Sequence, residues 1–393
     1  AGAHNIGGIA GFLKNSSIKN GTNDGGDITG TGARRSGENG AVAQERVRPD
    51  GHGQSHETFI IGNIGGIAGY MVDTELTSGS TIGSFIENST NRGTVHSRLV
   101  PVGTPIQDVL ESMKAANVGG VVGKLDAAAS QTLSDIGLDN DYQNASARHS
   151  YNTGSVQGYT GVGGVVGMMY NGSVAKSFNT GTIQSSRQAT VGTVDPLNMG
   201  GIVGDATEGT KASAVLYDVY NAGQIGDSSY TFYGRHVGGI AGRLSGDIYH
   251  SYNTGDIYNG YSVVGGIVGY WVGGTIENVF NTGNITVVNK DDNNAKGSQV
   301  GGLIGAFYLW DDNNSLQRES SSLTLAYNLG SIRSFTPVEN QYGNTVSGIV
   351  GTVDIANKLS VQQVYTLGNL YAAKQWNANQ DYESTGSTEV YKI

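Results

Sequence analysis

Val237-Gly-Gly-Ile-Ala-Gly-Arg-Leu244, then Gly246-Asp-Ile-Tyr-His-Ser-Tyr-Asn-Thr-Gly255 and Asp256-Ile-Tyr-Asn-Gly-Tyr-Ser-Val-Val264, is the stretch that decides the fold. The glycine pair that opens it at Gly238 returns 27 residues later at Gly265, so the stretch is one complete repeat. Gly, Asn and Ser corners divide it into three short β-prone runs. That content predicts one turn of a three-sided β-helix.

The motif Gly-Gly-(Ile/Val/Leu)-(Ala/Val/Ile)-Gly, or a close variant, occurs nine times along the chain. A single repeat cannot bury its apolar face alone, so neighbouring repeats must stack. The sequence therefore predicts one all-β domain over residues 1–393, a β-solenoid of about nine coils, expected to be a right-handed parallel β-helix. The nine motifs are Gly7–Gly11, Gly65–Gly69, Gly119–Gly123, Gly163–Gly167, Gly200–Gly204, Gly238–Gly242, Gly265–Gly269, Gly301–Gly305 and Ser347–Gly351.

Glycine accounts for 63 of the 393 residues, roughly double its usual share. Each glycine inside a strand costs about 0.5–1 kcal/mol relative to alanine. So many are tolerable only where backbones approach closely or turn sharply. We expect a side chain at Gly266 to crowd such a contact.

A second motif, (Tyr/Phe)-Asn-x-Gly, follows the glycine motif in most repeats. Stacked coils at about 4.8 Å per rung place like residues above one another, which predicts an asparagine ladder and a column of aromatic rings packed in the core. A carbohydrate-binding aromatic stripe is the alternative. Because asparagine tolerates left-handed backbone angles, we expect the corner at the Asn-x-Gly. The next β-branched residue should return to the core: Val156, Ile183, Ile225, Ile257, Ile285 and Ile332.

Spacings longer than one repeat indicate loops inserted at corners, since insertions of this kind leave a stacked core intact. One insertion contains a predicted helix, Thr104–Asn117, in which Thr104 and Gln107 form a capping box and Pro105 suits the first helical position. The last stretch, 370–393, is a terminal cap or a continuation. The insertions are expected at about 30–60, 99–117, 124–148, 286–299 and 308–322.

The charge balance argues against two classes of partner. The chain carries 33 acidic and 23 basic residues, a net charge of −10, whereas nucleic-acid phosphates and anionic lipid both attract clustered Lys and Arg. Cysteine is absent, which is common in large exported bacterial proteins. No apolar run reaches 18 residues, so no membrane insertion is expected in this segment.

The sequence gives weak indications of metal binding. His52, His56 and Glu57 lie in a polar loop, but without a helix or a second carboxylate the loop is better interpreted as solvated. Calcium prefers several oxygen ligands on a flexible loop, and three acidic corners could offer them, although none matches a known calcium loop. No other cofactor is expected. The corners are Asp139-Asn140-Asp141, Asp291-Asp292-Asn293-Asn294 and Asp311-Asp312-Asn313-Asn314.

No catalytic residue is predicted. The chain has no His-Glu-x-x-His metal motif and no Gly-x-Ser-x-Gly elbow. A β-helix enzyme acting on polysaccharides would need carboxylates converging on one face. Asp218, Asp247, Asp256 and Glu277 occupy different repeat positions, and the sequence does not bring them together.

The alternation of Gly-Gly-(Ile/Val)-Val-Gly with Asn-Thr-Gly resembles the GLUG repeat of large bacterial exported proteins, including filamentous-haemagglutinin-like, two-partner-secreted adhesins. The resemblance extends from Ile6 to about Gly368 and is best in Val162–Gly181, Val237–Gly255, Val264–Gly283 and Val300–Gly305. It supplies no functional residue.

The resemblance implies a secreted, cell-surface segment of a bacterial adhesin, or a structural passenger or stalk, without catalytic activity. Its partners would be host or matrix glycans or proteins. Two alternatives stay open. Identical subunits could stack into a filament or surface layer, or the chain could be a carbohydrate-active β-helix enzyme.

Overall fold

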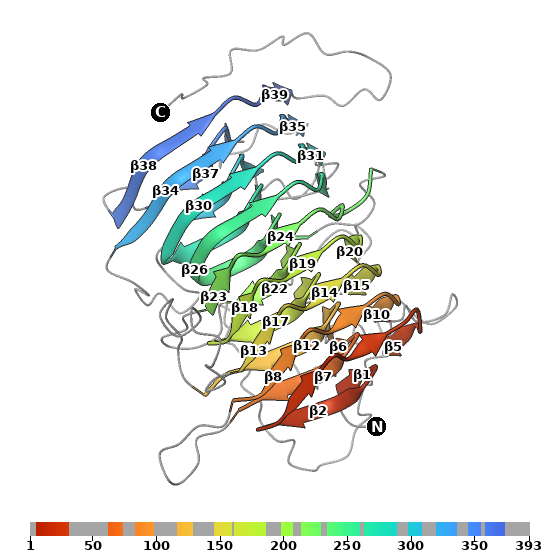
Figure 1. Ribbon diagram of the computed structural model, residues 1–393. Coiled ribbons are helices and arrows are strands. Elements are labelled where there is room, and N and C mark those ends of the chain that lie inside the picture. The colour runs from red at the N-terminus through yellow and green to blue at the C-terminus, as the bar shows by residue number, and fades with distance from the viewer. Residues whose placement is uncertain are drawn as a thin grey trace, which may run out of the picture.

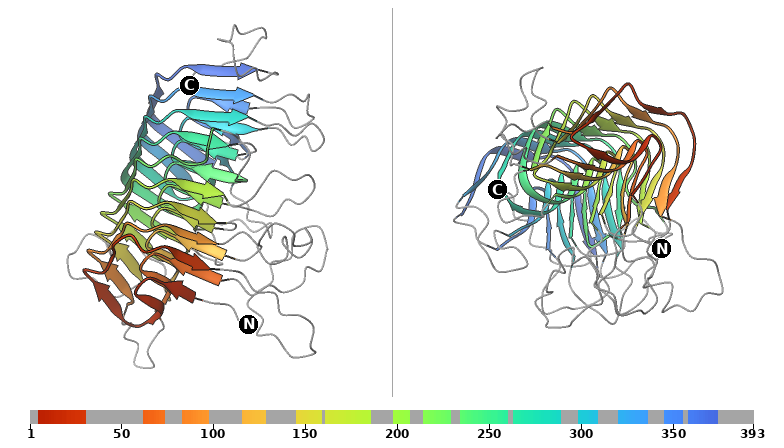
Figure 2. Two further views of the ribbon diagram at one scale, coloured as in Figure 1. Left: turned by 90° about the vertical axis from the view of Figure 1, so that its right-hand side faces the viewer. Right: turned by 90° about the horizontal axis from the view of Figure 1, so that it is seen from below.

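The computed structural model describes residues 5–30, 62–73, 83–97, 116–128, 145–158, 161–185, 198–206, 214–228, 234–259, 263–288, 298–308, 320–335, 345–354 and 358–373. These residues form a parallel β-solenoid whose coils are stacked from the N-terminal to the C-terminal end (Figures 1 and 2). They contain no α-helix. The predicted fold, an all-β solenoid of nine coils, is confirmed.

Each coil has four faces, and the residues of each face pair with their counterparts in the next coil to build sheets A, B, C and D (Figure 1). We number the coils 1 to 9 by their strands in sheet A. These strands are β1 (Asn5–Gly7), β6 (Gly62–Gly65), β11 (Ala116–Gly119), β16 (Gly161–Gly163), β21 (Asn198–Gly200), β25 (His236–Gly238), β28 (Val263–Gly265), β32 (Gln299–Gly301) and β36 (Thr345–Ser347).

Sheet B follows directly after the glycine corner of each coil. In coil 6 its strand runs on into sheet C as one long strand, β26 (Ala241–Asn253). The other strands of sheet B are β2 (Ala10–Lys14), β7 (Ala68–Val72), β12 (Val122–Asp126), β17 (Val166–Tyr170), β22 (Val203–Ala206), β29 (Val268–Gly273), β33 (Ile304–Phe307) and β37 (Val350–Val353).

Sheet C is the longest face, and in coils 1 to 5 a bend divides its strand into two pieces. The pieces are β3 (Ser17–Lys19), β4 (Thr22–Asn23), β8 (Phe85–Glu87), β9 (Thr90–Asn91), β13 (Ser146–Arg148), β14 (Tyr151–Asn152), β18 (Ser173–Ala175), β19 (Phe178–Asn179), β23 (Ala214–Tyr217) and β24 (Tyr220–Asn221). In later coils the strands are continuous: β30 (Thr275–Asn281), β34 (Ser321–Asn328) and β38 (Leu359–Thr366).

Sheet D closes the coil, and in coil 5 it is reduced to bridges from Ile225 to Ile183 and Ile257. Its strands are β5 (Ile28–Gly30), β10 (Val95–Ser97), β15 (Val156–Gly158), β20 (Ile183–Ser185), β27 (Ile257–Asn259), β31 (Ile285–Val288), β35 (Ile332–Phe335) and β39 (Leu370–Ala373).

The coil has four faces, A to D, so the predicted three-sided coil is wrong in this respect. These faces enclose two main hydrophobic cores. One cluster lies between sheets B and C, and a second lies between sheets A and D. The six β-branched residues expected to return to the core all lie in the second cluster, fully buried. Between the two cores, the glycine corner that joins sheets A and B approaches the opposite wall of its own coil.

The second glycine of each corner makes this approach possible. A Cβ at Gly266 would lie 2.1 Å from the carbonyl oxygen of Gly302 and 2.5 Å from Cγ of Asn281. Gly120 and Gly239 face Asn152 and Asn253 in the same way. Only a residue without a side chain fits there, which confirms the expected crowding at Gly266.

The predicted insertions fall largely outside the described residues, but several of their boundaries change. Residues 124–126 belong to β12 and 286–288 to β31, so those two insertions begin later than expected. The predicted helix Thr104–Asn117 lies outside the described residues except for its end. Ala116 and Asn117 begin strand β11, so the helix prediction is wrong for these two residues. Residues 370–373 form strand β39.

Candidate functional site

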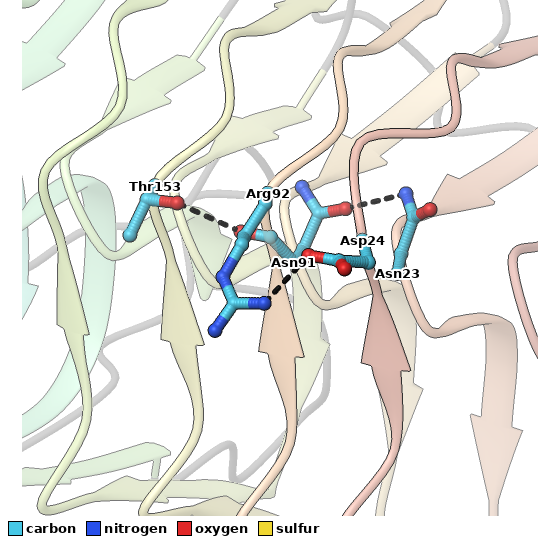
Figure 3. A network of polar contacts seen from close by, with 5 residues as sticks. All are labelled: Asn23, Asp24, Asn91, Arg92 and Thr153. Carbon is cyan, nitrogen blue, oxygen red and sulfur yellow. Dashed lines mark hydrogen bonds and ion pairs between the residues drawn. The ribbon is translucent and has the colours of Figure 1, made fainter.

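An asparagine ladder runs through the interior between the two cores, as the sequence predicted. In each rung Nδ2 donates to Oδ1 of the asparagine in the next coil at 2.7–2.8 Å. The same Nδ2 also donates to a glycine carbonyl, three residues on at Asn23 and two residues on at the other asparagines. Figure 3 shows the first rung, Asn23 to Asn91. The members are Asn23, Asn91, Asn152, Asn179, Asn221, Asn253, Asn281 and Asn328, and Thr366 closes the row in coil 9.

The aromatic residues that precede these asparagines form the expected column, but on the outer face of sheet C and not in the core. Adjacent residues of a strand face opposite sides. The asparagine faces inward, where the glycine corner leaves space for its amide, so the ring beside it must face outward. The seven rings are half-buried or exposed: Tyr151, Phe178, Tyr220, Tyr252, Phe280, Tyr327 and Tyr365.

The rings cover one another's faces. Their centroids are 4.2–5.3 Å apart and their planes differ by 2–23°. Burial and the neighbouring Tyr252 and Tyr151 raise the pKa of Tyr220 above its ordinary value. A ligand that binds by stacking needs a free ring face, whereas this column presents ring edges along its length. We therefore interpret the column as an outer support for the stacked coils.

The left-handed corner lies three residues before the predicted position. Asn253 does not have a positive φ, whereas His250 does. This position is exposed in every coil except coil 3, where His149 is half-buried, and its residue changes along the stack. Its members have φ between 46° and 56°: Asn20, Asn88, His149, Lys176, Asp218, His250, Asn278, Leu325 and Gln363.

Side chains on the outer faces of sheets A and B meet across the glycine corner, and in coils 5 and 6 these side chains are polar. Asn198 donates from Nδ2 to Asp205 at 2.6 Å, which turns its Oδ1 toward His236, 2.7 Å from Nδ1. Because an amide oxygen can only accept, His236 carries its proton on Nδ1.

The contact also includes an aromatic ring and a guanidinium group. The His236 ring lies 4.7 Å from the Tyr270 ring, and the Arg243 guanidinium lies 5.3 Å from the same ring. Burial, with Arg235 and Arg243 nearby, lowers the pKa of His236 well below its ordinary value. Asn198, Asp205, His236 and Arg243 are all buried. The cluster thus holds a neutral imidazole among buried polar side chains.

Sequence reasoning missed this cluster, although a signal was present. Asn198 and His236 each lie two residues before the first glycine of a motif, and Asp205 and Arg243 each lie five residues after it. Polar residues at two fixed positions on both sides of one corner indicate a contact across that corner. Asn5, Asn63 and Asn117 occupy the same position before the glycine motif in coils 1 to 3, and each is hydrogen-bonded to the next.

The four acidic residues considered for catalysis do not converge. Asp247 accepts a hydrogen bond from the Thr275 amide, and Asp256 accepts two from Asn284. Asp218 occupies the left-handed corner, and Glu277 lies opposite Tyr249 in sheet C. The first two carboxylates therefore join neighbouring coils.

One further carboxylate, Asp73, is buried where sheet B ends in coil 2. It accepts hydrogen bonds from the amides of Ala128 and Ala145, which lie at the two ends of a connection in coil 3. Burial raises its pKa above the ordinary value, and Asp126 adds to the effect. This geometry fits a group that anchors the connection.

The metal-binding candidates around His52 and in the three acidic corners lie outside the described residues. Within the described part of the chain, no group of three or more His, Cys, Asp or Glu side chains is placed to hold a metal ion. No helix there is long and apolar enough to cross a membrane. Comparison with models of known protein families, with characterised proteins and with solved structures gave no match to this chain.

Proposed function

We propose that this chain is a non-catalytic segment of a secreted bacterial surface protein, acting as an adhesin or as a structural passenger or stalk. Its partners are host or matrix glycans or proteins. The resemblance of its repeats to those of two-partner-secreted adhesins motivates the proposal.

One observation carries the proposal furthest. The interior repeats the same asparagine, glycine and β-branched residues in nearly every coil, whereas the exposed left-handed corner changes its chemistry from coil to coil. Lys176, Asp218 and His250 succeed one another there along the stack. A constant scaffold that presents a varied outer row is suited to recognition, in which contacts come from the surface and rigidity from the core.

Binding to immobilised matrix proteins and host-type glycans tests the proposal. The informative variant replaces His149, Lys176 and Asp218 together with asparagine, which occupies this position in coils 1, 2 and 7 and keeps the left-handed corner. We expect saturable binding by the folded chain, weaker binding by this variant and none after heat unfolding. The control replaces Thr153, Thr180 and Thr254, the exposed residues that follow the asparagine ladder, with serine.

Other outcomes would contradict the proposal. Binding to no surface would remove the adhesive role, and shortening of a polysaccharide in solution would favour the carbohydrate-active alternative. Fibres under the electron microscope would favour the filament alternative.

A further inference from the structure

We propose that the C-terminal end of the solenoid is a self-association surface, where coil 9 of one copy pairs with coil 9 of a second copy about a two-fold axis. The paired elements are the β38 edges, in antiparallel orientation. Three independent features of coils 8 and 9 support this inference, and none of them depends on the proposed adhesive role.

The first feature is a difference between the two ends. An open strand edge invites pairing with another chain, and proteins commonly protect such edges with charged residues, lysine above all. At the N-terminal end, strands β2 and β3 carry the exposed Lys14 and Lys19. At the C-terminal end, strands β36, β37, β38 and β39 contain no charged residue. The four described strands of coil 9 thus lack this protection, and the nearest described charges, Asp354 and Lys358, lie outside them.

The second feature is a set of exposed leucines on sheet C of the last two coils, in addition to the exposed Ile9 and Phe12 of coil 1. Leu325 occupies the left-handed corner, and Leu329 and Leu367 follow the asparagine row; they are 45%, 43% and 75% exposed. At the same positions coils 4 to 7 have Lys176, Asp218, His250 and Asn278, or Thr180, Ala222, Thr254 and Thr282. The internal coils show that folding does not require leucine there.

The backbone at Leu325 strengthens this point. Its φ is 53°, a conformation that is costly for a branched side chain and inexpensive for asparagine. A strained, exposed leucine is typical of a surface that is selected for contact. Tyr365, 51% exposed, adds the only open ring face at the C-terminal end of the described aromatic column.

The third feature decides between two ways of pairing. In coils 1 to 8 a Cβ on the first glycine of the motif would come within 2.6–2.8 Å of the third glycine's nitrogen in the following coil. Coil 9 has Ser347 at this position. If coil 1 of another copy followed in the same packing, its Gly11 nitrogen would meet the Ser347 side chain.

Head-to-tail stacking would also place apolar residues of coil 9 against polar residues of coil 1. It would place Leu367 next to Asp24, which Figure 3 shows in its ion pair with Arg92, and Tyr365 next to Thr22. Pairing of two C-terminal ends instead places the uncharged edges and the leucine patches together, and the same surface serves both copies, as a two-fold interface requires. The geometry therefore points to a closed dimer and not to an open filament.

The experiment is sedimentation equilibrium of the whole chain, wild type and variants. Ser360 of β38 and Ser17 of β3 occupy the same repeat position at opposite ends, and both are exposed. We expect the wild type to approach twice the 40.9 kDa chain mass as concentration rises. Ser360→Lys and Ser360→Glu should each raise the dimer dissociation constant about tenfold through repulsion across the two-fold axis. The matched control, Ser17→Lys, should leave it unchanged.

Mixing the two Ser360 variants gives a further check, because a Lys facing a Glu should restore the dimer. A wild type that stays monomeric at all concentrations would overturn the proposal. So would masses that grow beyond the dimer, which indicate head-to-tail contact, or association that Ser17→Lys abolishes and Ser360→Lys does not, which indicates pairing of the N-terminal ends. Circular dichroism of each variant confirms that the fold is kept.

Discussion

Glycine and asparagine together set the cross-section of this solenoid. The second glycine of each motif lets the corner approach the opposite wall, and the asparagine of the same coil fills the remaining space with a hydrogen-bonded amide. Neither works without the other. A side chain on the glycine would strike the amide, and without the corner close by the amide would leave a buried void.

Gly266→Val tests this contact. The new side chain would overlap the Gly302 carbonyl and the Asn281 amide, so we expect a loss of about 3 kcal/mol in the free energy of unfolding. Chemical denaturation measures it. Thr282→Val, one residue beyond Asn281 on the exposed side, is the control and should change the midpoint little. An unchanged midpoint for Gly266→Val would refute the packing role.

Asn253→Ala tests one rung of the ladder. The fully buried Asn253 accepts from Asn221 and donates to Asn281 and Gly255. Its removal leaves polar groups on both neighbours without a partner, which should cost about 1–3 kcal/mol. Asn284→Ala, at an exposed position, is the comparison. Equal midpoints for the two variants would show that the ladder adds nothing to stability.

Leu325→Asn is expected to stabilise the protein. The corner keeps its left-handed backbone with a residue that tolerates it better. The free energy of unfolding should therefore increase by roughly 0.5–1 kcal/mol, and the melting temperature should rise with it. Leu329→Asn removes a neighbouring exposed leucine that has no positive φ and should bring no such gain. A lower melting temperature for Leu325→Asn would mean that the leucine side chain stabilises the fold.

At the scale of elements, the alternation of side chains along a strand explains the largest error of the sequence analysis. The Tyr-Asn pair cannot place both residues inside, and hydrophobicity alone favours the ring. The asparagine lies inside because each of its hydrogen bonds finds a partner there. Local composition does not reveal which of two adjacent residues has partners waiting in the next coil.

The contact between sheets A and B predicts a pH dependence. The pKa of His236 is lowered in the folded protein, whereas in the unfolded chain it is near 6.5. Below that pH the unfolded state takes up a proton that the folded state does not, so stability falls as the pH decreases from about 6.5 and is fully present above it. The groups that face the imidazole are Asn198, Arg235, Arg243 and Tyr270.

His236→Asn should reduce this acid sensitivity, because asparagine occupies the same position in coils 1, 2, 3 and 5. The measurement is the free energy of unfolding between pH 5 and 8. His96→Asn, on the outer face of sheet D, is the matched comparison at a different histidine. If both variants keep the same slope, His236 is not the titrating group.

At the scale of the whole molecule, each coil contacts its neighbours through the same set of rows, so the structure behaves as a one-dimensional stack. Nine rungs at about 4.8 Å give a height of roughly 43 Å. A stalk built from one such unit would reach only a short distance. The proposed pairing of two C-terminal ends would double this length.

Deletion of residues 161–197, which comprise coil 4, should leave a folded protein. Coil 3 would then stack directly on coil 5, with Asn152 on Asn221, Tyr151 on Tyr220 and Asn117 on Asn198. Gly161 interrupts the outer asparagine row in coil 4, and the buried Oδ1 of Asn117 has no hydrogen-bond partner. Cooperative melting with a native β-sheet spectrum is expected.

A shorter deletion supplies the control. Removing residues 161–175 takes out strands of sheets A, B and part of C but leaves the rest of coil 4, so every later row loses its register. We expect this shorter deletion to prevent folding, whereas the deletion of the whole coil should leave a folded protein. If both deletions unfold the protein, the coils are not interchangeable units.

The sequence by itself determined the repeat, the number of coils and the stacking of like residues, because a fixed motif can bury its apolar side only against its own copies. The asparagine ladder and the close approach at Gly266 followed from that. Only the tertiary structure decided which residue of each Tyr-Asn pair lies inside, that the coil has two cores, and that Asn198, Asp205 and His236 meet. These depend on distances between segments of different coils, which hydrogen bonding and backbone approach set in three dimensions and no local pattern records.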